Sequence, residues 1–230
     1  MSDAILTGHH LEKSFGKTPA LRDAQISVTR GELVSITGPS GSGKSTLLHC
    51  LAGIQTPDSG EVWFNGARID DLDNTARTLL RRREFGFVFQ FGELITELTA
   101  LENVALPLLL GGESRVTALN RSQEWLERVG IPQLGDRTPS EMSGGERQRV
   151  AVARSLVHEP VLVFADEPTG ALDSLAAEKL LELLVGIVET SDLTLVMVSH
   201  DPRVAAYGQR EVVIRDGRSV TPSDVPTIAN

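Results

Sequence analysis

The stretch Gly38 to Thr46, which reads G-P-S-G-S-G-K-S-T, constrains the fold of this chain more than any other. It matches the pattern G-x-x-x-x-G-K-[ST] at every fixed position and stands between an apolar run, Leu33 to Thr37, and an apolar helical pattern. This strand, loop and helix context is the one in which the pattern binds phosphate. A glycine-rich loop that merely turns the chain would need neither the lysine nor the hydroxyl. The sequence therefore predicts a phosphate-binding loop in an α/β fold.

The chemistry expected at this loop follows from its residue types. The glycines let backbone N–H groups turn inward, and the N-terminus of the following helix adds a positive dipole. Lys44 would place its charge on the terminal phosphates, and the Ser45 hydroxyl would reach a phosphate-bound Mg²⁺. The residues predicted to bind phosphate are Gly38, Pro39, Ser40, Gly41, Ser42, Gly43, Lys44, Ser45 and Thr46.

Composition and charge limit the partners of the chain. Its 230 residues carry 31 acidic and 22 basic side chains, a net charge of -9, which argues against charge-driven binding to nucleic acid or anionic lipid. A membrane span needs about twenty apolar residues, and Val104 to Leu110 is short and contains Pro107. The N-terminus, M-S-D-A-I-L, lacks the regions of a signal peptide. We expect a soluble, cytoplasmic protein that contacts a membrane only through a partner.

The order of the predicted elements indicates one domain over residues 1–230. Short strands at 5–11 and 24–28, and a hairpin closed by Asn65-Gly66, predict an antiparallel sheet. Residues 92–150 read as an inserted helical subdomain, with Thr99 and Glu102 as a capping box. Apolar strands at 161–165 and 193–198, separated by a helix at 176–188, predict a mainly parallel core. A hairpin at 212–220 closes the domain, and the tail from Thr221 is expected to be loose.

Two opposite charge runs lie between the predicted hairpin and the next strand, at 85–89. They are Asp70 to Asp73 and Arg81 to Arg83. We interpret both as solvated faces rather than as a metal or nucleic-acid site.

Several polar residues stand where predicted parallel strands end, which is the edge where ligands bind in such sheets. The run V-L-V-F-A-D-E-P contains a predicted buried strand that ends in Asp166 and Glu167. One carboxylate would help to hold Mg²⁺, and the other would orient or deprotonate a water. A solvated turn is the alternative for this pair. His200 and Gln90 also follow strands, and Gln90 would contact the metal or the attacking water.

A second anion-binding helix start is predicted at M-S-G-G-E-R-Q-R, where Ser143, Gly144 and Gly145 precede a helical pattern. An ordinary serine-capped helix is the alternative. Two such starts far apart in one chain are consistent with a nucleotide shared between two copies.

These motifs together resemble the nucleotide-binding subunit of ATP-binding cassette (ABC) transporters, over nearly the whole chain. By this resemblance the loop is the Walker A motif, Gln90 the Q-loop residue, Ser143 to Glu146 the signature, Asp166 the Walker B aspartate and Glu167 the catalytic base. Asp173 ends the D-loop, His200 is the switch histidine, and Phe15 would stack on adenine, where relatives often have tyrosine. Met142 and Glu146 replace the commonest leucine and glutamine of the signature.

The resemblance also implies how the protein works. Two copies would close on two ATP with Mg²⁺, and residues 90–101 would receive a coupling helix from an integral membrane permease. The stretches at 89–108 and 166–174 look most like the branch of macrolide exporters, lipoprotein-release ATPases, haem exporters, bacitracin-type peptide-resistance transporters and the cell-division ATPase. Two functions remain open: export or extraction of a hydrophobic substrate, and an ATP-switched regulator that passes force or a signal to envelope enzymes.

Overall fold

The computed structural model describes residues 4–220, so the expected loose tail lies outside the described residues. The chain divides into two compact units, which we describe separately: a terminal unit made of residues 4–77 and 196–220, and a middle unit made of residues 78–195. Helix α2 (Asn74–Glu84) crosses the boundary in sequence.

The terminal unit contains the predicted antiparallel sheet, with strand order β2-β1-β4-β5. These strands are β1 (Ala4–Phe15), β2 (Thr18–Thr29), β4 (Ser59–Phe64) and β5 (Ala67–Arg68). The turn between β4 and β5 is the predicted one, with Asn65 and Gly66 at φ 49° and 75°. β1 and β2 are longer than expected, because their long hairpin pairing continues to Phe15 and Thr18.

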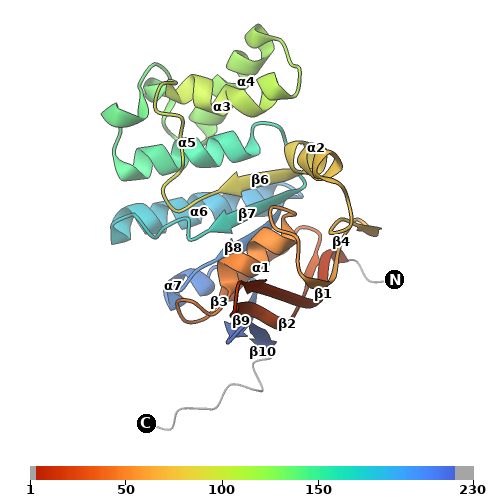
Figure 1. The fold of residues 1–230 in the computed structure, drawn as a ribbon. Coiled ribbons are helices and arrows are strands. Elements are labelled where there is room, and N and C mark those ends of the chain that lie inside the picture. Colours follow the sequence, from red (N-terminus) through yellow and green to blue (C-terminus); the bar gives the residue numbers. More distant parts are fainter. Residues whose placement is uncertain (1–3, 221–230) are drawn as a thin grey trace. The chain divides into compact units, whose positions relative to one another are not determined.

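The phosphate-loop segment lies in the same unit. Strand β3 (Leu33–Thr37) is buried along its whole length and pairs in parallel with β9 (Arg210–Arg215), which pairs antiparallel with β10 (Arg218–Val220). Helix α1 (Lys44–Leu51) follows the loop, and its Leu51 lies against Gly8 of β1. The strand, loop and helix order predicted around Gly38 is therefore confirmed (Figure 1).

The core of the middle unit is built around two parallel strands, β6 (Phe85–Val88) and β7 (Leu162–Asp166). The four residues Leu162 to Ala165 are all buried, as expected for a strand covered on both faces. Phe164 meets Phe85 edge to face, with ring centroids 5.3 Å apart. The next strand, β8 (Thr194–Val198), begins where the Thr194 N–H donates to the Val161 carbonyl.

Helices make up most of the remaining middle unit, and they lie close to where the sequence predicts them (Figure 1). They are α3 (Ala100–Leu110), α4 (Arg115–Arg128), α5 (Gly144–Leu156) and α6 (Ser174–Thr190). Thr99 and Glu102 form the predicted capping box of α3. Two single-turn 3-10 helices, Pro132–Leu134 and Pro139–Glu141, interrupt the loop between α4 and α5.

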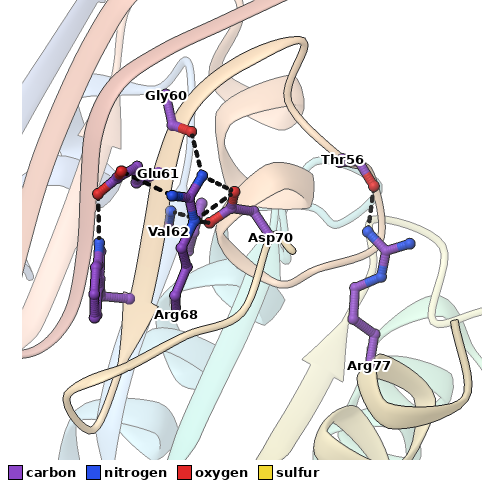
Figure 2. A network of polar contacts seen from close by, with 8 residues as sticks. Thr56, Gly60, Glu61, Val62, Arg68, Asp70 and Arg77 are labelled. Atoms are coloured by element: carbon purple, nitrogen blue, oxygen red, sulfur yellow. Dashed lines mark hydrogen bonds and ion pairs between the residues drawn. The ribbon is translucent and has the colours of Figure 1, made fainter. Parts of the chain in front are cut away.

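The prediction of a solvated face is wrong for Asp70, whose side chain is only 7% exposed. Figure 2 shows its carboxylate beside the Arg68 guanidinium, which donates to both carboxylate oxygens and to Glu61. Burial alone would raise the pKa of Asp70, but the hydrogen bonds from Arg68 and the Val62 N–H lower it below its usual value. Asp70 therefore ties the β5 end of the sheet to β4. Arg82 and Arg83 are exposed, as predicted.

Candidate nucleotide-binding site

The loop Gly38 to Thr46 depends on glycine at two close approaches in the terminal unit. Gly38 and Gly43 have φ values of 142° and 104°, in the region that side chains disfavour. A Cβ on Gly38 would lie 2.1 Å from the Ile214 carbonyl oxygen, and one on Gly43 would lie 2.3 Å from that of Ala20. The loop backbone is thus wedged between β2 and β9, with no room for a side chain at either glycine.

The interior of the loop is organised around Lys44. Its Nζ donates to the carbonyls of Gly38 and Pro39, both at 2.9 Å, and the residue is 5% exposed. Lys44 also opens α1, whose N-cap residue Gly43 makes no side-chain capping bond. An uncapped helix start beside a held ammonium group gives the N–H donors and the positive charge that a polyphosphate needs.

The chain end of the terminal unit braces the loop. The Gly217 N–H, in the turn between β9 and β10, donates to the Ser42 carbonyl at 2.9 Å. The Ser42 hydroxyl is buried and, within the described residues, has no hydrogen-bond partner. Buried polar atoms normally have a hydrogen-bond partner, so the Ser42 hydroxyl is consistent with a polar ligand that binds in this glycine-rich loop.

The structure brings the predicted switch residue to the base of this loop. Ser199, directly before His200, donates its N–H to the Ile36 carbonyl, two residues ahead of Gly38. His200 itself is exposed. Phe15 is the last residue of β1, directly before the turn to β2, and is 51% exposed. Phe15 pairs with Thr18, the first residue of β2. Two residues further along β2, Ala20 packs against Gly43 of the phosphate loop.

In the middle unit, the two predicted acids stand at the end of β7. Asp166 is the last residue of the strand, and Glu167 follows it with φ 47°, an uncommon conformation for a residue that is not glycine. The Glu167 carbonyl accepts a hydrogen bond from the Gly170 N–H at 3.0 Å, which closes a turn.

Gln90 lies against this same turn. It occupies a turn of its own, in which the Gly92 N–H donates to the Phe89 carbonyl at 3.1 Å. A Cβ on Gly170 would lie only 2.7 Å from Gln90 Nε2, so the Gln90 amide covers Gly170. The structure therefore brings Gln90 and the segment after Glu167 together, as predicted from their places at strand ends.

The predicted signature forms the start of α5. Ser143 is its N-cap residue and forms a capping box with Glu146; hydrogen bonds from the Ser143 backbone and hydroxyl lower the pKa of Glu146. A Cβ on Gly145 would lie 3.4 Å from Ala176 Cβ in α6, and Asp173 caps α6 by accepting from the Ala176 N–H. The signature and Asp173 are thus neighbours.

Sequence reasoning missed the residues that hold these loops. Ile214 and Gly217 support the phosphate loop from about 175 residues away. Gln148 and Arg154, on α5, donate to carbonyls around Gln90. No local motif marks such contacts, because each depends on which distant backbone the fold brings alongside.

Comparison with known proteins agrees with this geometry. A family model described as ABC transporter matches residues 21–170. Among solved structures, the dimeric ATP-binding cassette MJ0796 in a post-hydrolysis state bound to ADP and Pi is 39% identical, with a TM-score of 0.86, covering 94% of this chain and 97% of that chain. A second dimeric structure of MJ0796, described as a bacterial ABC transporter cassette, is also 39% identical and has a TM-score of 0.87, with the same coverage. The cbiO1 protein from Clostridium perfringens, part of the ABC transporter complex cbiONQ, is 30% identical with a TM-score of 0.86, covering 96% of this chain and 88% of that chain.

The fold and its phosphate loop define a P-loop nucleotide-binding α/β protein, which confirms the predicted fold class. The chain belongs to the ABC transporter family. It is an ATP-binding cassette, an ATPase that works with Mg²⁺.

Proposed function

We propose that this chain powers a separate integral membrane permease that exports a hydrophobic substrate or extracts one from the bilayer. The observation that carries the ATP-driven part of this proposal is the loop around Lys44, whose ammonium group and uncapped helix start fit the phosphates of ATP. The substrate class, a drug, peptide, haem or lipoprotein, is taken from the exporter branch that residues 89–108 and 166–174 resemble.

The residues assigned to the nucleotide in this proposal are those predicted from the sequence. Gly38 to Thr46 bind the phosphates, and Phe15 stacks on the base. Glu167 acts as general base, with Gln90 and His200 orienting the attacking water or the terminal phosphate. The donors assigned to Mg²⁺ are Ser45, Gln90 and Asp166. All three offer oxygen atoms, which Mg²⁺ prefers, and few protein ligands are needed where phosphates supply others.

The proposed working form contains a second copy of the chain. Ser143, Gly144, Gly145 and Glu146 of each copy bind the nucleotide held by the other, and Asp173 lies at the same boundary. The dimeric MJ0796 structures and the membership of cbiO1 in a transporter complex support a homodimer that works with a permease. Each copy then acts as one domain over residues 1–230, with the helical subdomain at about 92–150.

The proposed location is the cytoplasmic face of the cell membrane, reached through the permease. Within residues 4–220, no helix is both long enough and apolar enough to cross a bilayer. The acidic net charge of -9 gives no attraction to nucleic acid, so we propose no nucleic-acid partner.

The assignment of the base is tested with Glu167→Gln. Removing the general base should lower kcat for ATP hydrolysis by about a hundredfold or more. ATP should still drive dimer formation, which size-exclusion chromatography with and without ATP would measure. Hydrolysis at the original rate would show that Glu167 is not the base.

The transport role needs a separate experiment. The permease is co-purified with the cassette from membranes, reconstituted in vesicles, and assayed for ATP-dependent movement of a lipid-soluble dye and a lipopeptide. Movement of either one supports a transporter. ATP hydrolysis that responds to the permease without any movement favours the regulator, in which force is passed on without transport.

A further inference from the structure

The turn that carries Gln90 is held on both sides by one helix, α5. Gln148 Nε2 donates to the Phe89 carbonyl, just before Gln90, at 2.8 Å. Arg154 donates to two carbonyls further along the turn: Nη2 to Gly92 at 2.7 Å and Nη1 to Glu93 at 2.8 Å. Three carbonyls flanking Gln90 therefore take hydrogen bonds from two side chains of the same helix.

The contact between this turn and α5 is also close in its packing. Gly92 has φ 71°, and a Cβ there would lie 3.3 Å from Gln148 Oε1 and 3.5 Å from Ala151 Cβ. Gln148 is 2% exposed, so its amide is committed to this contact. A buried amide that loses its partner carries a desolvation cost, which makes displacement of the turn unfavourable.

Arg154 uses its charge in an unusual way. The guanidinium is withdrawn from water, and this burial lowers the pKa of Arg154. Within residues 4–220, its hydrogen bonds go to the carbonyls of Gly92 and Glu93 and not to a carboxylate. Charge-assisted donation from one planar group to two successive carbonyls fixes both the place and the direction of the backbone between them.

The same helix begins at the signature. Ser143 caps α5, while Gln148 and Arg154 lie one and three turns further along. Phe91, beside Gln90 in the turn, is 70% exposed, so the turn presents an apolar corner to solvent while its ends stay attached to α5.

We propose that Gln148 and Arg154 are positioning residues for Gln90, and that they make the Gln90 turn and the Ser143 helix start move as one body. This rests on the proposed function, in which Gln90 acts on the bound nucleotide and the signature completes the site of a second copy.

A double-mutant cycle on ATP hydrolysis tests the proposal. Arg154→Ala and Gln90→Ala should each lower kcat by about tenfold with little change in KM, because both leave the nucleotide bound and lose a catalytic orientation. The double variant should be no slower than Gln90→Ala alone. Losses that multiply, or an unchanged kcat in Gln90→Ala, would overturn the proposal. Gln148→Leu, which removes the other donor at similar volume, is taken through the same cycle in case Arg154→Ala fails to fold.

The matched control is Arg149→Ala. Arg149 also lies on α5 and donates to a carbonyl, that of Val129, at 2.7 Å. Arg149→Ala should leave kcat within about twofold, because no predicted site residue depends on that bond.

Hydrogen exchange of the amides at 90–95 should be faster in Arg154→Ala than in Arg149→Ala; equal rates would also contradict the proposal. Glu167→Gln, measured in parallel, distinguishes failure of the proposed function from failure of the positioning proposal. Unchanged hydrolysis in this variant would contradict Glu167 as the general base but would not affect the hydrogen-exchange comparison.

Discussion

Ser143 and Glu146 exchange hydrogen bonds at the start of α5. The backbone N–H and the hydroxyl of Ser143 both donate to Glu146 Oε2 at 2.8 Å, and the Glu146 N–H donates to Ser143 Oγ at 3.3 Å. The helix start proposed to face a second copy's nucleotide therefore already carries a carboxylate of its own, where relatives most often have the neutral amide of glutamine. This charge should oppose an incoming phosphate.

Replacing that carboxylate by the neutral amide, in Glu146→Gln, should lower KM for ATP a few-fold at low salt, since like-charge repulsion is removed while an oxygen remains to accept the capping bonds. The difference should shrink at high salt. The hydrogen bonds from Ser143 lower the pKa of Glu146, so its charge persists at any pH above its ordinary pKa. The effect should consequently be constant between pH 6 and 8. Equal KM values in the two proteins at low salt would contradict this view.

The close approach of Gly43 to β2 predicts that Gly43→Ala weakens nucleotide binding. Its Cβ would meet the Ala20 carbonyl at 2.3 Å, so the loop must move, and nucleotide binding should fall by about a hundredfold or more. Gly66→Ala is the control, because Gly66 has a positive φ of 75° but no atom within 4 Å of a Cβ. It should cost only about 1 kcal/mol of stability and leave nucleotide binding intact. Titration with a fluorescent ATP analogue would measure both, and equal binding losses would refute the steric explanation.

Phe15 should contribute to affinity without selecting the base. Stacking on an aromatic ring is worth about 1–3 kcal/mol per base and depends little on which base it is. Phe15→Ala should therefore weaken ATP and GTP binding alike, by about tenfold, and Phe15→Tyr should restore both. Competition assays with the two nucleotides would test this. A loss confined to ATP would show that Phe15 reads the base.

Stability should fall in mild acid because of His158. Its Nε2 contacts the Phe85 carbonyl at 3.0 Å, and its Nδ1 is buried with no partner in the described residues. Burial lowers the pKa of His158 below the ordinary value of 6.5, so the unfolded chain takes up a proton before the folded one does. The stability linked to His158 is thus full above pH 6.5 and is lost as the pH falls toward the folded pKa. Urea unfolding should show that the free energy of unfolding falls less between pH 7.5 and pH 5.5 in His158→Gln than in the unchanged protein. An equal fall in both proteins would contradict the role of His158.

Local signals made much of this fold predictable. The Asn65-Gly66 turn, the Thr99–Glu102 box and the Ser143 cap each depend on a few neighbouring residues, and each appears as expected. Helix α2 was missed because its arginine-rich sequence leaves no residue buried, so no apolar period marks it. Asp70 was misjudged because its partner Arg68 approaches only once β5 has formed beside β4.

The candidate site shows the same division. Strand ends and the glycine pattern predicted the residues that we propose to face a nucleotide, since both follow from chain order. The supporting contacts of Ile214, Gly217 and Arg154 join segments that are remote in sequence. The hydrophobic periodicity of the sequence does not predict which of these segments lie side by side.

The brace from Gly217 to Ser42 has a consequence for synthesis of the chain on the ribosome. A nascent chain carries its complete phosphate-loop motif once residue 46 has emerged, yet Ile214 and Gly217 arrive about 170 residues later. Until then the loop lacks one wall of its wedge. We therefore expect chains that end before Gly217 to bind ATP more weakly than chains translated past it.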